Sequence, residues 1–118
     1  MALPKNAKRE AQIKLSTFCE ERIPERVRDE LRLDFNFWGN NVNLVEKRIH
    51  WKNKEEWIDI RVAQFRYDPD TERWSLLWVD SNDRLHPYEE LVPEFTPEKD
   101  LSKLIQEVDE DPTGIFWG

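Results

Sequence analysis

Residues 57–88 hold three short runs of alternating apolar and polar residues, and a turn signal separates each run from the next. Side chains alternate between the two faces of a strand, so Trp74 and Trp78 share one face. Pro69, which presets turn geometry, lies in the first connection, at 68–73, and Asp residues, which bond to the backbone of turns, lie in both this and the second connection, at 80–83. The pattern therefore predicts an antiparallel meander of three strands.

The apolar residues also set the register of this meander. The predicted pairs are Tyr67 with Trp74, Phe65 with Leu76 and Ala63 with Trp78. A slip of one residue would place polar side chains beside the tryptophans, because it moves every side chain to the other face. In the third run we expect Leu85 opposite Trp78, and Pro87 restricts this run to an edge of the sheet.

The apolar positions change phase near Val62, from even-numbered positions upstream to odd-numbered positions downstream. One extra residue, a β-bulge near Val62, would place both apolar sets on one face. The opposite face would then carry Asp59, Arg61, Gln64, Arg66, Ser75 and His86. The candidate binding residues are Arg61, Gln64, Arg66, Asp80 and His86. An alternative is that different helices cover the two faces of the sheet, one at each end.

An earlier hairpin is predicted from residue 31 onwards, where apolar and polar residues alternate up to Phe37. A glycine in the first position of a two-residue loop suits a type II′ turn, and Gly39 stands there, followed by Asn40. With this loop, the expected pairs are Phe37 with Val42 and Phe35 with Leu44.

The apolar stripe of this hairpin runs into three ionisable residues spaced two apart, Glu46, Arg48 and His50. Such a break in local pattern tends to mark a functional or strained site. Near neutral pH, Glu or His can serve as a general base, and Arg can stabilise an anionic transition state. These three are the candidate catalytic residues. The structural interpretation is that Glu46 and Arg48 form a partly buried ion pair that closes the sheet.

Helices are predicted at both ends of the chain. Asn6 is a plausible N-cap for a helix whose apolar residues include Leu15 and Phe18, and Pro24 opens a short second turn or helix. Thr96 and Pro97 read as the N-cap and first residue of a C-terminal helix. The predicted fold is an α+β single domain, 1–118, with an N-terminal helical segment 1–30, an antiparallel sheet of four to five strands 31–88, a C-terminal helix 96–110 and a docked tail 111–118.

Charge bears on the kind of partner. Residues 1–66 hold 14 basic and 11 acidic groups, whereas residues 67–118 hold 4 basic and 14 acidic groups, and the formal net charge is −7. General nucleic-acid binding is therefore disfavoured, since neutralisation of phosphates drives it. A local basic strip is an alternative to an ordinary solvated surface. It would consist of Arg48, Lys52, Lys54, Arg61 and Arg66.

The cysteine and histidine content bounds the setting and the cofactors. The single cysteine, Cys19, cannot form an internal disulfide, and no signal-peptide pattern or membrane-length apolar run is found. We therefore expect a cytoplasmic protein that does not enter the membrane. Two histidines and one cysteine provide no recognisable transition-metal framework, so we expect no metal site and no cofactor.

Several segments resemble a known protein family. They are FCEERIP at 18–24, AQFRYD at 63–68 and DPTGIFWG at 111–118. From about residue 16 to the end, the chain is similar to the bacterial domain-of-unknown-function family 3024. The resemblance implies a small, stand-alone bacterial protein, and it supplies no reaction.

No run of residues forms a specific catalytic, metal-binding or phosphate-binding signature. This favours a non-enzymatic binding or adaptor module with a protein or peptide partner. The alternative is a small hydrolase- or nuclease-like enzyme that uses Glu46, Arg48 and His50. We expect a monomer, or a weak homodimer formed through the edge strand after Asp83.

Overall fold

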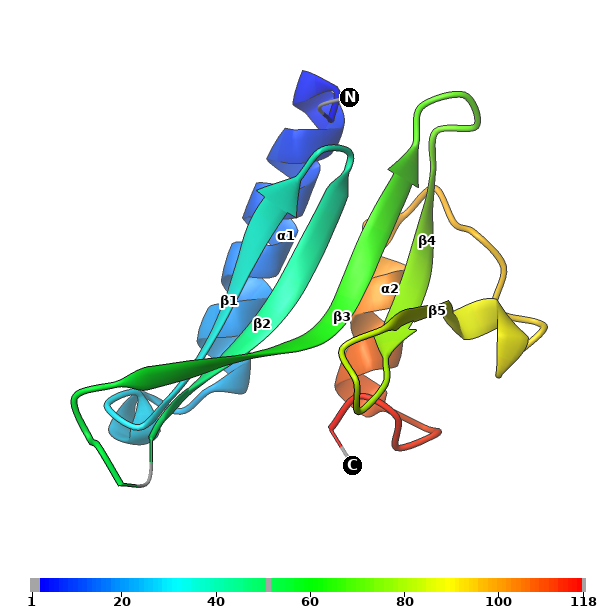
Figure 1. Ribbon diagram of the computed structural model, residues 1–118. Coiled ribbons are helices and arrows are strands. Elements are labelled where there is room, and N and C mark those ends of the chain that lie inside the picture. Colours follow the sequence, from blue (N-terminus) through cyan, green and yellow to red (C-terminus); the bar gives the residue numbers. More distant parts are fainter. Residues whose placement is uncertain (1–2, 51, 118) are drawn as a thin grey trace.

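The computed structural model describes residues 3–50 and 52–117 (Figure 1). The outer ends of the predicted segments 1–30 and 111–118 therefore lie outside the described residues. One antiparallel sheet has five strands in the order β1-β2-β3-β4-β5. The strands are β1 (Leu31–Trp38), β2 (Asn41–Ile49), β3 (Trp57–Asp68), β4 (Arg73–Val79) and β5 (Leu85–Pro87). The predicted α+β class, a meander flanked by terminal helices, is confirmed.

Two α-helices, α1 (Lys5–Arg22) and α2 (Leu101–Glu110), lie behind the same face of the sheet (Figure 1). We call this the inner face. The buried side chains of both helices form one apolar cluster with the strands. Its members include Ala11, Leu15, Leu44, Phe65, Trp74, Leu104 and Val108. Neither α-helix covers the other face, which we call the outer face, so the alternative of helices on both faces is wrong.

The register predicted for the centre of the sheet is confirmed. Tyr67 pairs with Trp74, Phe65 with Leu76 and Ala63 with Trp78. The hairpin pairs Phe37 with Val42 and Phe35 with Leu44. Gly39 has a φ angle of 60°, and Asn40 is not among the described residues with positive φ, as a type II′ turn requires.

The predicted bulge is also present. Leu44 pairs with Ala63 and Val45 pairs with Arg61, so Val62 is the extra residue of β3. Beyond this point β2 and β3, at residues 45–49 and 57–61, continue with residues 31–34 of β1 as a three-stranded arm, and its β3 edge projects past the two α-helices (Figure 1). Ile58 and Ile60, which pair with Arg48 and Glu46 on the arm, are 40% and 44% exposed, so this part of β3 is not packed into the core.

The register of β5 differs from the prediction. Val79 pairs with Leu85 and Trp78 pairs with His86, so the expected contact of Leu85 with Trp78 is wrong. The reason is the turn, in which Asp80 N–H donates to the Arg84 carbonyl and closes a three-residue loop at 81–83. His86 therefore shares a face with Trp78, and their ring centroids lie 4.4 Å apart. As predicted, β5 is a short edge strand that ends at Pro87.

Both helices begin at other residues than predicted. The helix α1 starts at Lys5 after Pro4, so Asn6 lies inside it. In α2 the N-cap is Asp100, whose side chain accepts a hydrogen bond from Ser102 N–H. Residues 96–100 are not helical because Glu98 exchanges two backbone hydrogen bonds with Trp74, at 2.7 and 2.9 Å. Pro24 precedes a short 3₁₀ helix, η1 (Glu25–Val27), and a second one, η2 (Tyr88–Glu90), follows β5.

The single thiol and the described helices bear on the predicted setting. Cys19 is buried on α1, and burial raises the pKa of its thiol to about 12, so the group packs as a small apolar side chain. Among the described residues, neither α1 nor any other helix combines the length and apolar character needed to cross a membrane.

Candidate functional site

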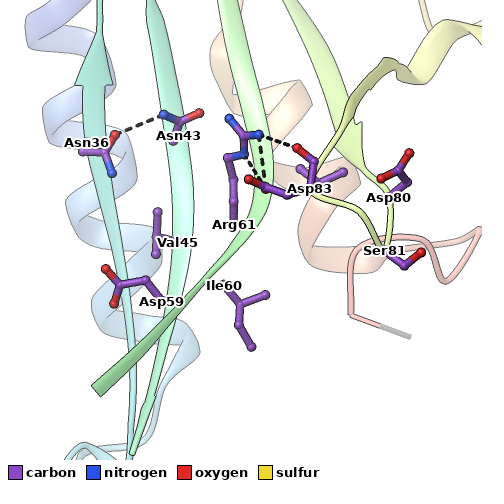
Figure 2. Close-up of a pocket in the computed structure, with 10 residues that line it drawn as sticks. Asn36, Asn43, Val45, Asp59, Ile60, Arg61, Asp80, Ser81 and Asp83 are labelled. Atoms are coloured by element: carbon purple, nitrogen blue, oxygen red, sulfur yellow. Dashed lines mark hydrogen bonds and ion pairs between the residues drawn. The ribbon is translucent and has the colours of Figure 1, made fainter. Parts of the chain in front are cut away.

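The outer face of the sheet carries a groove with a volume of about 630 Å³ (Figure 2). Its base is formed by the middle of β1, β2 and β3, and one side is formed by the turn between β4 and β5. The lining residues are Asn36, Asn43, Val45, Asp59, Ile60, Arg61, Val79, Asp80, Ser81 and Asp83.

The groove depends on the bulge at Val62. A bulge bends its strand and increases the local twist, which turns the arm out of the plane of the remaining sheet. Arg61, the next residue on the arm, reaches the β4–β5 turn (Figure 2). Its Nε donates to Asp83 Oδ1 at 3.2 Å, and its terminal nitrogen donates to the Asp83 carbonyl at 2.9 Å. Arg61 and Asp83 therefore tie the arm to the opposite side of the groove.

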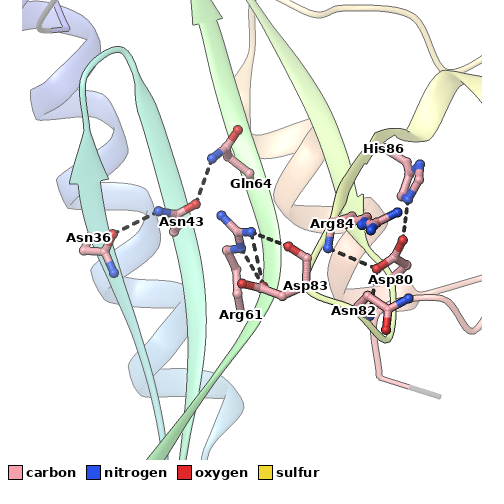
Figure 3. A network of polar contacts seen from close by, with 9 residues as sticks. All are labelled: Asn36, Asn43, Arg61, Gln64, Asp80, Asn82, Asp83, Arg84 and His86. Carbon is pink, nitrogen blue, oxygen red and sulfur yellow. Dashed lines mark hydrogen bonds and ion pairs between the residues drawn. The ribbon is translucent and has the colours of Figure 1, made fainter.

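A chain of side-chain hydrogen bonds crosses the outer face beside the groove (Figure 3). Asn43 Nδ2 donates to Asn36 Oδ1 at 3.1 Å, and Gln64 Nε2 donates to Asn43 Oδ1 at 2.9 Å. Arg66 donates in turn to Gln64 Oε1 at 3.1 Å. Gln64 is only 3% exposed, so the chain includes a polar residue that is buried and hydrogen-bonded at both ends of its amide. We call Asn36, Asn43 and Gln64 the amide row.

Asp80 organises the β4–β5 turn and holds His86 (Figure 3). Its Oδ1 accepts hydrogen bonds from the backbone N–H groups of Asn82 and Arg84, at 2.8 and 3.0 Å. His86 Nε2 donates to Asp80 Oδ2 at 2.7 Å, since an ionised carboxylate can only accept. The hydrogen bond from His86, followed by that from Arg84 N–H, lowers the pKa of the Asp80 carboxyl to about 2. Asp80 is therefore ionised at every pH near neutrality.

This shift predicts a pH dependence of stability. A carboxyl whose pKa is lower in the folded state stabilises the fold above its unfolded pKa, so the contribution of Asp80 is present above about pH 4 and is lost towards pH 2. Asp80→Asn should therefore melt at a lower temperature at pH 7 and lose less of its melting temperature between pH 4 and pH 2 than the original chain. Circular dichroism melts across this range measure both effects.

Asp100 provides the control for this comparison. Its pKa is also lowered to about 2, first by the hydrogen bond from Lys14 and then by that from Ser102 N–H, at the start of α2. Asp80→Asn should leave this second acid-sensitive contribution in place, so some acid destabilisation remains. Parallel pH profiles of the original chain and Asp80→Asn would contradict the assignment to Asp80.

The groove has an acidic lining with apolar patches. Three carboxylates, Asp59, Asp80 and Asp83, face one guanidinium, Arg61, which gives the lining a formal charge of −2. Val45, Ile60 and Val79 provide the apolar surface. Such a lining can accept a cationic group at the carboxylates while apolar atoms pack beside it, and the amides of the amide row can both donate and accept hydrogen bonds.

The structure separates the candidate binding residues. Arg61 and Asp80 line the groove, and Gln64 and Arg66 belong to the hydrogen-bond chain beside it. His86 was expected on the outer face but shares the face of Trp78, because the turn is one residue longer than predicted and shifts the pairing of β5 by one residue. The sequence did not single out Asn36, Asn43, Asp59 and Asp83 as site residues. The sequence indicates only which face of the sheet these residues occupy, since Asn36 and Asn43 alternate with core residues on adjacent strands.

The candidate catalytic residues lie elsewhere. Glu46 is 8% exposed on the inner face opposite Leu33, and its carboxylate forms an ion pair with Arg48 Nε. His50 Nδ1 accepts hydrogen bonds from the backbone N–H groups of Lys52 and Asn53, both at 3.1 Å. None of Glu46, Arg48 and His50 lines the groove. Glu46 and Arg48 are thus brought together, as the structural interpretation has it.

This ion pair yields a stability prediction. Arg48→Met leaves the buried Glu46 carboxylate without its guanidinium, and we expect a loss of about 1–2 kcal/mol in the free energy of unfolding, below the usual cost of breaking a buried pair because Arg48 is largely exposed. The double variant Glu46→Leu/Arg48→Met should recover most of this loss, since it leaves no unpaired charge. Urea denaturation at pH 7 measures both values.

Lys47→Met is the matched control for Arg48→Met. Lys47 also lies on β2, but its ammonium is 3.9 Å from Asp34 at the surface, and such pairs contribute about 0–1 kcal/mol. A double variant no more stable than Arg48→Met alone would show that the unpaired carboxylate is not the cause.

The suggested basic strip does not gather on one face. Arg48 projects from the inner face, opposite Leu31 and Ile58, whereas Arg61 and Arg66 project from the outer face. Arg61 is moreover paired with Asp83, and Arg48 with Glu46.

Fold and site together define a small α+β protein in which two helices cover one face of an antiparallel meander and the other face holds an acidic groove. The chain belongs to the family described as a domain of unknown function (DUF3024), whose model matches residues 3–118. The resemblance found in the sequence is thereby confirmed. No curated protein and no solved structure shows significant similarity to the chain.

Proposed function

We propose that this protein is a non-enzymatic binding module that holds an extended segment of a partner protein in the outer-face groove, with a basic side chain of that segment among the carboxylates. The observation that supports this proposal best is the groove itself, about 630 Å³ on a sheet face that neither α-helix covers. Ligand sites in proteins commonly have volumes of about 300–1,000 Å³. The groove is thus large enough for a few residues of a peptide.

The charge of the lining favours a basic side chain. Asp80 already accepts hydrogen bonds from the backbone of the turn and from His86, and Asp83 is paired with Arg61. Asp59 is an exposed carboxylate on the arm, so it is the group best placed to meet a Lys or Arg of the partner. The net charge of −7 would also attract basic segments from a distance.

The amide row favours a peptide over a simple cation. Its members both donate and accept hydrogen bonds, as a peptide backbone does, and Asn36 and Asn43 lie at the groove. Each of their amides is already held by a neighbour, so their positions are fixed before a partner arrives. Fixed polar groups reduce the entropy that binding costs.

Fluorescence anisotropy with short labelled peptides tests the proposal. Three peptides share a sequence of alternating Val and Ser residues and differ at one central position, which is Lys, Glu or norleucine. We expect the Lys peptide to bind with the lowest Kd. Asp59→Asn should weaken its binding by about three- to fivefold at low salt, the effect of losing one exposed charge pair, and added salt should reduce the difference.

Asp70→Asn is the control variant for Asp59→Asn. It makes the same change of charge at an exposed position of the β3–β4 turn, outside the groove. It should leave the affinity for the Lys peptide unchanged. Equal binding of all three peptides, or equal effects of the two substitutions, would contradict the proposal.

A further inference from the structure

The edge strand β1 differs from the other edge of the sheet. β1 has eight residues, no proline and no bulge, and it pairs only with β2 (Figure 1). β5, at the opposite edge, has three residues and ends in Pro87. A long regular edge is a template for a further strand, whereas a short edge with proline is protected from such pairing. The sequence predicted a dimer contact at the edge strand after Asp83, which is β5. The longer and more regular edge of β1 is better suited to such a contact.

The backbone of β1 presents a regular set of groups to this edge. Ile49 N–H donates to the Glu30 carbonyl at 3.1 Å, so residue 30 and the even-numbered residues of β1 bond to β2. The N–H and C=O groups of the odd-numbered residues, Leu31 to Phe37, consequently point away from the sheet. In agreement with this parity, Phe35 N–H is bonded not to β2 but to Asp34 Oδ1, at 2.8 Å.

We propose that β1 is a homodimer interface, in which β1 of a second copy pairs antiparallel to it with Leu33 opposite Leu33 of the partner. The two copies are then related by a two-fold axis through this pair, so every contact occurs twice. The two sheets join into one, and both α1 helices lie on the same side of it.

The charges on β1 select this register. Registers centred on Leu33, Asp34, Phe35 or Asn36 overlap more than half of the strand. The Asn36-centred register sets Asp34 opposite Trp38 and leaves Arg32 beyond the paired residues, so it forms no ion pair. A centre at Asp34 sets two carboxylates directly opposite each other, which is unfavourable. A centre at Leu33 instead sets Arg32 opposite Asp34 of the partner, twice, and Leu31 opposite Phe35, twice.

The Phe35-centred register leaves these opposite charges apart. It sets Asp34 opposite Asn36 and Arg32 opposite Trp38, so neither ionic group meets its counter-charge. In the Leu33-centred register, Phe35 N–H passes from Asp34 Oδ1 to a carbonyl of the partner strand. The Asp34 carboxylate, which lies 3.9 Å from the Lys47 ammonium, then accepts from Arg32 of the partner, whose guanidinium leaves its contacts with the Arg28 carbonyl and the Trp57 ring. Asp34 thus protects the edge in the monomer and contributes an ion pair in the dimer.

Sedimentation velocity over a wide concentration range tests the interface. The original chain should shift from monomer to dimer as its concentration rises. Arg32→Asp or Asp34→Arg alone should raise the dimer Kd by about tenfold or more, because each change replaces two attractive pairs by two repulsive ones. The double variant Arg32→Asp/Asp34→Arg should return the Kd to within about threefold of the original, since it restores both attractions with exchanged signs.

Two further measurements locate the contact and exclude general effects of charge. Arg9→Asp and Asp70→Arg make the same charge reversals at exposed positions of α1 and of the β3–β4 turn and should leave the Kd unchanged. Hydrogen exchange of the Leu33 and Phe35 amides should slow as dimer forms. A chain that stays monomeric up to submillimolar concentration overturns the proposal, as does a dimer that is indifferent to both single reversals. Circular dichroism confirms that every variant is folded.

Discussion

Replacing Trp74 with alanine is expected to lower the free energy of unfolding by about 3–5 kcal/mol, the usual cost of removing a fully buried large aromatic side chain. Trp74 is 1% exposed and packs against Tyr67 with ring centroids 4.9 Å apart. Its Nε1 donates to Glu10 on α1 at 3.2 Å, so the substitution also breaks a link between sheet and helix. A domain of this size is stable by only about 5–15 kcal/mol. Urea denaturation followed by circular dichroism measures the loss.

Trp38→Ala is the matched control for Trp74→Ala. Trp38 also lies on a strand, but it is 74% exposed, and surface substitutions usually change stability by no more than about 0.5 kcal/mol. The two variants remove the same side chain, so the difference between them isolates burial. If both lost the same stability, the assignment of Trp74 to the core would be wrong.

Asp111→Ala is expected to cost about 2–4 kcal/mol and to release the C-terminal segment, because hydrogen bonds to a charged group contribute about 1.5–3 kcal/mol each and are not fully additive. Asp111 Oδ1 accepts from Phe116 N–H at 3.1 Å, and Oδ2 accepts from Trp117 N–H at 2.9 Å. The released segment would lose two contacts, that of Trp117 Nε1 with the Val108 carbonyl at 2.7 Å and the packing of Phe116 on Tyr88. Denaturation and hydrogen exchange of the two amides measure the effect.

Two comparisons isolate the role of the Asp111 carboxylate. Asp111 has a φ of 45°, a conformation that Asn tolerates better than Ala, and Asn keeps one acceptor oxygen, so Asp111→Asn should lose about half as much as Asp111→Ala. Asp109→Ala removes a neighbouring carboxylate that pairs with Arg22 at the surface, and it should cost less than about 1 kcal/mol. Amides of Phe116 and Trp117 that stay protected in Asp111→Ala would show that other contacts hold the segment.

The centre of the sheet was predictable because its side chains leave one register open. Only one register keeps polar residues out of the core. It pairs the apolar residues of the two strands, which are Tyr67, Phe65 and Ala63 on β3 and Trp74, Leu76 and Trp78 on β4. The bulge was predictable for the same reason, since the apolar phase changes at a single residue, Val62. In both places the apolar pattern extends over many residues, so an error of one position has a large cost.

The parts that were not predictable depend on single hydrogen bonds. Whether Leu85 or His86 faces Trp78 is decided by the Asp80 side chain, which closes the turn at three residues. The start of α2 depends likewise on the pairing of Glu98 with Trp74, a contact that is distant in the sequence. Local propensity gives no information on either.

The groove was only partly predictable. Arg61 and Asp80 stood out as polar residues in an aromatic sheet, but Asn36 and Asn43 are ordinary residues for a solvated strand. They belong to a site because the twist at the bulge brings the arm and the β4–β5 turn to either side of them. A pattern of period two records which face a residue occupies, and it does not record how strongly that face curves.

Within residues 57–66 of β3, Val62 is the one residue that has no partner on β2, so its deletion would remove the bulge and leave the other pairs in place. A regular strand that kept Val62 would instead pair Val62 with Val45, and residues 57–61 would all change faces relative to β2, which would turn Arg61 towards the helices. Relatives that lack a residue at this point should therefore keep the same side chains on each face and lose the bend of the arm.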